Sequence, residues 1–262
     1  VLETVPIIND GTVTVAKPGI KGQIEFKNVS FKYPDAEDYV LQNITFTVAQ
    51  GETVAFIGST GCGKSTVINL VPRFYDVTEG EVLVDGINVK AYTQYALHNK
   101  IGYVSQKAVL FSGTIESNVA YGDNGRNNNL QNNVIDAIYT AQASDFVEAS
   151  PRRYNSYVAQ GGSNYSGGQK QRAVIARIFA SDPDIFVLDE PTTGMDAGTA
   201  NTFYELMHHS AHKHGKSVLM ITHDPEEVKE YTDRNIHLVR NQKLPWRCFN
   251  VHEKDGEEHK HD

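Results

Sequence analysis

A glycine-rich loop between an apolar strand and a helix is the feature that most constrains the fold of this chain. Residues 53–57 (TVAFI) form a short, continuously apolar run, as expected of a strand buried on both faces. The next residues match the P-loop, or Walker A, pattern, with a helix from about Gly63: Gly58-Ser59-Thr60-Gly61-Cys62-Gly63-Lys64-Ser65-Thr66. Such a loop turns backbone N–H groups inward, and with the helix start it binds phosphate. The alternative is an incidental glycine-rich loop, and the order strand, turn, helix argues against it.

Two side chains of this loop have chemical roles in the pattern. Lys64 would reach the β- and γ-phosphates of a nucleotide, and the Ser65 hydroxyl would coordinate Mg²⁺. The whole run from residue 58 to residue 66 is therefore a candidate nucleotide site. Cys62 is interpreted as a small passive residue of the loop, although modification of its thiol would block phosphate.

Two further motifs follow the loop. Asp189-Glu190 closes the apolar run at residues 185–188, so Asp189 would hold magnesium from the end of a buried strand beside the P-loop strand, as in a Walker B motif. Glu190 would act as the general base on the attacking water. The run Ser166-Gly167-Gly168-Gln169 begins a helix and offers a second anion site, with Asn164 or Ser166 as the helix cap.

Composition and charge narrow the function class. The chain has 262 residues, 40% hydrophobic and 21% charged, which is globular composition, and its net charge of −8 argues against nucleic acid as a partner. Two cysteines cannot form a disulfide framework, so we expect a reducing, intracellular setting. No apolar run is long enough to span a bilayer. The start at Val1 without Met suggests an excised or processed piece.

The remaining pattern alternates strands with helices, which predicts an α/β fold with a mostly parallel sheet. Residues 24–31 fit an exposed edge strand with a slip near Asn28, and residues 123–133 fit a polar loop that leads into a helix. Further strands are expected at residues 40–48, 101–104, 185–189 and 217–221, and helices at 134–180, with a Gly-rich break at 161–168, and at 197–213.

The order of these motifs, ending in Thr222-His223-Asp224, resembles the ATPase domain of ABC transporters over residues 23 to about 240. The resemblance implies that Tyr33, with Val40, contacts adenine. It implies that Gln106 is the Q-loop residue at magnesium and water, that Asp196 belongs to the D-loop, and that His223 is the switch histidine at the γ-phosphate.

The resemblance also implies architecture and partners. We expect a P-loop NTPase (RecA-like) core, an antiparallel subdomain near residues 23–50 and 80–90, and a helical subdomain at about 107–180. The ATPase domain would run from 23 to 245, after a linker at 1–22. Two domains would pair head to tail around ATP and Mg²⁺, and couple to transmembrane domains at the cytoplasmic face of the membrane.

Departures from the family pattern suggest a hybrid. Tyr165 replaces the usual Leu, and residues 158–164 and 111–115 are similar to multidrug-type exporters. From about Ala180 onward the chain is similar to bacterial zinc or manganese importer ATPases. We hypothesise a junction near residues 169–172; the alternative is one natural protein of mosaic appearance.

The tail at residues 246–262 is rich in His and acidic residues. A loose metal site is one interpretation, built from His252, His259, His261, Glu257, Glu258 and Asp262. We favour a solvated, disordered end, and we expect a solvated helix face from His208, His209, His212 and His214. The favoured function is Mg-dependent ATP hydrolysis that drives a transporter. The alternative is a nucleotide-binding module that dimerises without turnover. A family member acting on DNA or ribosomes is disfavoured, because no basic stripe is present.

Overall fold

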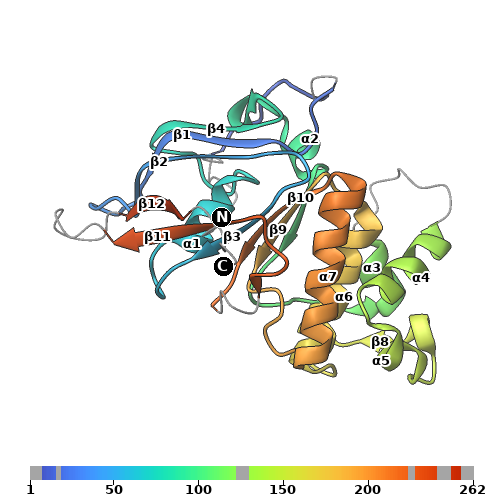
Figure 1. Cartoon of the computed structure of the whole chain (residues 1–262). Helices are drawn as coiled ribbons and strands as arrows, with labels where there is room; N and C mark the ends of the chain where they lie inside the picture. The colour runs from blue at the N-terminus through green and yellow to red at the C-terminus, as the bar shows by residue number, and fades with distance from the viewer. Residues whose placement is uncertain (1–7, 16–18, 122–129, 224–227, 241–248, 255–262) are drawn as a thin grey trace, which may run out of the picture.

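The computed structural model describes residues 8–15, 19–121, 130–223, 228–240 and 249–254. A mixed sheet lies at the centre, an antiparallel sheet lies on one side of it, and a group of helices lies on the other (Figure 1). Helix α1 (Lys64–Leu70) begins directly after the P-loop. The predicted P-loop α/β fold with an antiparallel subdomain and a helical subdomain is confirmed.

The central sheet has the strand order β12-β11-β3-β10-β9-β6. Its parallel strands are β3 (Thr53–Ile57), β6 (Ile101–Val104), β9 (Ile185–Asp189), β10 (Ser217–Ile221) and β11 (Arg234–Arg240). Every residue of β3, β9 and β10 is buried, which explains their unbroken apolar sequences.

The sequence predicted that the strand ending at Asp189 lies beside the P-loop strand, and this prediction is wrong. Strand β10 pairs with β3 on one side and with β9 on the other, so the strand that ends at Asp189 does not lie beside the P-loop strand. Strand order in a parallel sheet is set by crossover connections, which a local sequence pattern does not reveal. Both strands nevertheless end at the same edge of the sheet, where ligands bind in such folds.

The antiparallel sheet has the order β2-β1-β4-β5, with β1 at Ile24–Phe31, β2 at Leu41–Val48, β4 at Glu79–Val84 and β5 at Ile87–Asn88. The slip expected near Asn28 is confirmed: the register shifts between Phe26 and Val29, and Asn28 has φ 50°. The expected edge position is wrong, because β1 pairs with β4 as well as with β2. Exposed Lys27 and Asn28 at the bulge mimic an edge strand in the sequence.

Two short helices separate the antiparallel sheet from β6, and a further group of helices forms the helical subdomain. The former are η1 (Val89–Ala91) and α2 (Gln94–His98); the latter are α3 (Ile115–Ala120), α4 (Leu130–Thr140), α5 (Ser144–Glu148), η2 (Arg153–Asn155), η3 (Gln160–Gly162) and α6 (Gly167–Ser181), with a small sheet of β7 (Gly113–Thr114) and β8 (Tyr157–Val158). Helix α4 begins at Leu130, so the end of the predicted loop at 123–133 is helical; residues 122–129 lie outside the described part.

A buried ion cluster joins the two sheets. Lys100, just before β6, lies 2.6 Å from Asp85 Oδ2 after β4 and 3.1 Å from Asp184 Oδ2 before β9. Burial lowers the pKa of Lys100, but its hydrogen bonds to the two carboxylates outweigh burial and raise the pKa overall. Because Asp85 is fully buried, loss of Lys100 would leave an uncompensated charge.

Helix α7 (Ala197–His214) shares a buried apolar cluster with α6, and three of its four histidines are exposed, as expected of a solvated face. His212 Nε2 lies 3.0 Å from Asp233 Oδ1, and its ring stacks within 4.1 Å of His208. A backbone hydrogen bond to His208 and the Asp233 charge raise the pKa of His212. Among the four histidines of α7, His208 is the half-buried one.

The C-terminal end of the described chain joins the central sheet. Strand β12 (Phe249–Lys254) pairs antiparallel with β11, where the sequence suggested a solvated end. Its alternation of apolar and polar residues fits the open edge of β11. The proposed metal ligands at positions 257, 258, 259, 261 and 262, and the side chain of His252, lie outside the described part. Among the described helices none has the length and apolar content needed to cross a membrane.

Candidate nucleotide-binding site

A cavity of about 400 Å³ opens at the carboxyl edge of the central sheet. It is lined by residues from six separate places in the sequence: Tyr33, Val40, Thr60, Gly61, Cys62, Gly63, Lys64, Ser65, Thr66, Gln106, Glu190 and His223. The structure therefore brings the P-loop and the assigned residues Tyr33, Val40, Gln106, Glu190 and His223 around one space. Gly58 and Ser59 border it through contacts with Lys64.

The P-loop has the backbone that its glycines allow. Gly61 has φ 76° and Gly63, the N-cap of α1, has φ 89°, both in the left-handed region. A Cβ atom on Gly63 would also lie 3.1 Å from a methyl carbon of Leu41. No side chain caps α1, so the first N–H groups of the helix remain for a ligand.

Lys64 lies inside the loop rather than in solvent. Its side chain is 6% exposed, and Nζ donates to Gly58 O at 2.6 Å and to Ser59 O at 3.3 Å. The buried Cys62 Sγ lies 3.9 Å from the same ammonium. A buried cation held by neutral carbonyl oxygens favours an anionic ligand.

Ser65 of the cavity lining is paired with Asp189, which is buried just outside that lining. Ser65 Oγ donates to Asp189 Oδ1 at 3.3 Å, because helix α1, which carries Ser65, packs against both β9 and β10. Burial raises the pKa of Asp189 above its ordinary value, against the hydrogen bond from Ser65, which lowers it. Burial therefore disfavours the ionised form of this carboxylate.

Glu190 is held from two sides. Gln106 Nε2 donates to Glu190 Oε2 at 2.9 Å, and His223 Nε2 lies 2.5 Å from Glu190 Oε1. The backbone of Glu190 has φ 49°, a left-handed conformation that non-glycine residues adopt rarely. Strain of this kind is typical of functional positions, and here it aims the carboxylate into the cavity.

Tyr33 also lines the cavity. Its hydroxyl lies 2.9 Å from Thr66 Oγ1, and its ring packs edge-on against Phe31 and Tyr75. Val40 is a further lining residue. An aromatic ring and a branched apolar side chain in the lining fit a planar base, and the stacking assigned to Tyr33 stays a prediction.

The second glycine motif does not reach this cavity. Residues 166–169 and Asp196 are absent from its lining. Ser166 caps α6 by accepting from Gln169 N, and Gln169 Oε1 accepts from Ser166 N, which confirms the predicted helix start. Asp196 caps α7, and its hydrogen bonds with Thr199 lower its pKa.

The start of α6 contacts the loop before Asp196 within the same chain, which the sequence did not indicate. A Cβ atom on Gly168 would lie 2.5 Å from Gly194 O, so the helix start and the loop that leads to Asp196 pack backbone to backbone. Tyr103 was also missed: it donates to Asn69 Oδ1 on α1 at 2.8 Å, and burial raises its pKa to about 12. A tyrosine in an otherwise apolar strand was the available signal.

Comparison with known families decides the class. Residues 41–193, more than half of the chain, match the family model described as ABC transporter. The chain belongs to the ABC transporter family. The predicted resemblance is thereby confirmed, and the chain is an ATP-binding domain, the ATPase part of such a transporter.

Relatives come from both transporter classes. The chain is 46% identical over 244 residues to the zinc transport system ATP-binding protein AdcC of Streptococcus pneumoniae, covering 89% of this chain and 97% of that protein. It is 36% identical over 242 residues to the ATP-dependent lipid A-core flippase of Syntrophus aciditrophicus, covering 92% of this chain and 39% of that protein.

A solved structure supports the fold. The chain is similar to a bacterial Atm1-family ABC exporter with ATP bound, with a TM-score of 0.79 and 32% identity, over 94% of this chain and 40% of that chain. The chain thus spans nearly all of the zinc transport system protein and about two fifths of the flippase and of the exporter chain. ABC ATPases dimerise and work with transmembrane domains.

Proposed function

We propose that this domain hydrolyses Mg-ATP at the cavity formed by the P-loop, Gln106, Glu190 and His223. The observation that carries the proposal is the position of the Glu190 carboxylate, which faces the phosphate-binding loop and is oriented by two hydrogen-bonding side chains. Hydrolysis needs positioned water and charge neutralisation more than covalent chemistry, and this arrangement supplies both.

The chain fits a magnesium ion with oxygen ligands. Ser65 Oγ and Asp189 Oδ1 are 3.3 Å apart, and the Gln106 carbonyl is available because its amide nitrogen is the atom bound to Glu190. The raised pKa of Asp189 is consistent with a carboxylate that is most stable beside a cation. When bound, Mg²⁺ would neutralise charge that develops on the phosphate oxygens.

The remaining roles belong to side chains of this chain. Lys64 would exchange the Gly58 and Ser59 carbonyls for phosphate oxygens. Glu190 would accept the proton of the attacking water, and Gln106 and His223 would orient its carboxylate. Because two neighbours already orient the Glu190 carboxylate, its position is preorganised for catalysis.

Glu190→Gln tests the assignment of the base. Amide replacement keeps size and hydrogen bonding but removes the proton acceptor, so we expect kcat to fall by about 10²–10⁴-fold while ATP binding persists. Phosphate release and equilibrium nucleotide binding should be measured on the same sample. Glu205→Gln is the matched control, because Glu205 is exposed on α7. Undiminished hydrolysis in Glu190→Gln would contradict the assignment.

We infer that two copies, or a copy and a related domain, pair head to tail, with residues 166–169 of one facing the P-loop of the other. The exposed glycine-rich helix start, which does not line the P-loop cavity of its own chain, supports this arrangement. Trapping of a dimer by ATP in the Glu190→Gln variant tests it by sedimentation. A variant that binds ATP and stays monomeric at every concentration would contradict it.

The alternative is a domain that binds ATP and dimerises without turnover. The oriented Glu190 argues against it, and steady-state phosphate release by the unmodified chain decides between the two. We place the domain at the cytoplasmic face of a membrane, because its relatives are parts of transporters.

The hybrid origin also remains a proposal, supported by relatives of both classes. The importer alignment covers 89% of the chain and the flippase alignment 92%, more than either side of residues 169–172 holds, so each crosses the proposed junction. Identity computed separately before and after the junction tests the idea. Equal identity to one relative on both sides would contradict a hybrid.

A further inference from the structure

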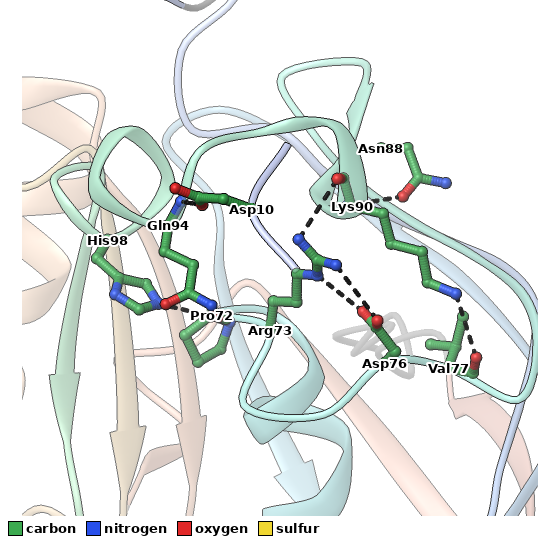
Figure 2. A network of polar contacts seen from close by, with 9 residues as sticks. All are labelled: Asp10, Pro72, Arg73, Asp76, Val77, Asn88, Lys90, Gln94 and His98. Carbon is green, nitrogen blue, oxygen red and sulfur yellow. Dashed lines mark hydrogen bonds and ion pairs between the residues drawn. The ribbon is translucent and has the colours of Figure 1, made fainter. Parts of the chain in front are cut away.

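Residues 10–13, which precede the antiparallel sheet, are docked on the segment between η1 and α2. Gly11 N donates to Tyr92 O at 3.0 Å, Thr12 N and Val13 N both donate to Ala91 O at 2.9 Å, and Thr93 N donates to Val13 O at 2.9 Å. Val13 pairs with Tyr92 as a parallel bridge. Figure 2 shows Asp10 reaching the start of α2, where Gln94 N donates to Asp10 Oδ1 at 2.5 Å.

Glycine at position 11 makes this contact possible. A Cβ atom there would lie 2.2 Å from Ala91 O and 2.6 Å from Tyr92 O, closer than any real contact. Gly11 is not among the glycines with left-handed φ, so an alanine would suit its backbone. The need for glycine therefore comes from close approach to residues 91–92 alone, and a substitution would oppose docking without straining the docked segment itself.

The segment that receives these residues is connected to the nucleotide site by two routes. At the far end of α2, the His98 Nε2 atom lies 2.9 Å from Pro72 O, just after the P-loop helix (Figure 2). Helix α2 also leads directly into β6, which ends two residues before Gln106, and Tyr103 of β6 bonds to Asn69 of α1.

A buried arginine ties the same segment to the chain beyond α1. Arg73 is 6% exposed and donates to Lys90 O at 3.4 Å, next to the Ala91 carbonyl that receives the docked residues. Its other bonds reach both carboxylate oxygens of Asp76, at 2.7 and 3.3 Å, so its direction is fixed (Figure 2). Residues 90–94 are thus held between the Arg73 side and the docked segment.

We propose that residues 10–13 form a positioning strap, which holds α2 so that α1 and Gln106 are in register for nucleotide. The strap acts through α2 rather than on nucleotide, so Asp10 and Gly11 are positioning residues. The inference rests on the proposed function. Release of the strap would not change the identity of any cavity residue. It would loosen helix α1, which carries Lys64, and strand β6, which leads to Gln106.

Gly11→Ala tests the strap in the full chain, with Thr12→Ala as the matched control. Thr12 is exposed, and its replacement keeps the backbone N–H that bonds to Ala91 O. Hydrogen exchange of residues 93–100, Mg-ATP affinity and the kcat of phosphate release should be measured on each protein. We expect Gly11→Ala to raise exchange and to weaken affinity several-fold, while Thr12→Ala matches the unmodified chain.

A second pair of variants separates the strap from general destabilisation. Asp10→Ala removes the acceptor for Gln94 N, whereas Asp10→Asn keeps an oxygen in its place, so only Asp10→Ala should reproduce the loss of affinity. Faster exchange with unchanged affinity and kcat would overturn the proposal, and so would unchanged exchange in Gly11→Ala. An unmodified chain that fails to bind Mg-ATP would instead contradict the proposed function.

Discussion

The two glycine-rich helix starts of this domain are built differently. In the P-loop cradle, residues 58–66, Lys64 is buried against carbonyls of its own loop, and Ser65 contacts a buried carboxylate. In the signature cradle, residues 166–169, Ser166 and Gly167 are exposed, and the side chains bond only within the capping box. The P-loop cradle is thus part of a pocket lined by charged side chains, whereas the signature cradle lies on the exposed surface.

This difference separates two kinds of function. A buried cation with replaceable neutral partners can bind an anion within a single molecule. An exposed helix start offers N–H groups and a dipole but no enclosure, so it gains strength only when a second surface excludes water. Variants of the P-loop cradle should therefore change affinity at any protein concentration, and variants of the signature cradle should act through stability and association.

Lys64→Ala should give the largest effect. Removal of one charged donor to phosphate is worth about 1.5–3 kcal/mol, so we expect affinity for Mg-ATP to fall by about 10–100-fold in dilute, monomeric protein. Titration of a fluorescent nucleotide measures it. Ser166→Ala should leave this monomer affinity unchanged. Equal losses in the two variants would break the distinction between the cradles.

Gly168→Ala should come next, because its Cβ would overlap Gly194 O. Overpacking of this kind costs about 1–3 kcal/mol of unfolding free energy, measurable by urea denaturation. Gly167→Ala is the matched control, because its Cβ meets open space, and the better helix propensity of alanine should leave stability equal or slightly higher. A Gly168→Ala protein as stable as Gly167→Ala would show that the contact with Gly194 yields easily.

Ser166→Ala should cost less, about 1 kcal/mol of unfolding free energy, since it removes the cap of α6. Ser163→Ala, at an exposed position three residues earlier, serves as the control in the same urea experiment. The two variants should differ in midpoint by the value of the cap. Identical midpoints would mean that packing on Gly194, rather than capping, sets the start of this helix.

Asp189→Asn should give a small gain of stability at neutral pH. The pKa of Asp189 is raised in the folded protein, so the folded state holds its proton to higher pH than the unfolded chain does. Above both pKa values the ionised group therefore lowers stability, and the asparagine protein should be the more stable. The difference should vanish on acidification below about pH 3.9, the ordinary pKa of aspartate. A neutral-pH loss would mean that the Ser65 contact outweighs burial.

The sequence predicted correctly those features that depend on residues adjacent along the chain. The P-loop, the signature cap and the strand ending at Asp189-Glu190 are set by neighbours along the chain, and the structure has each of them in the expected form. The meeting of Tyr33, Gln106 and His223 around the P-loop was also anticipated, but from family resemblance rather than from local pattern.

Strand order and long-range contacts could be seen only in the structure. No local signal shows that β10 separates β3 from β9, or that β1 is flanked on both sides, because strand order depends on crossovers and on a bulge at Asn28. The contacts of Gly168 with Gly194 and of Gly11 with Ala91 were invisible for the same reason. A glycine at a long-range contact looks like a glycine in any turn.

The left-handed backbone at Glu190 has a consequence for anyone who engineers this domain. Glycine or asparagine would occupy that conformation at lower free energy. A library of variants screened only for thermal stability would be enriched in those two residues at position 190. It would yield thermostable proteins that lack the proposed catalytic base. Any such screen therefore needs a parallel selection for ATP hydrolysis.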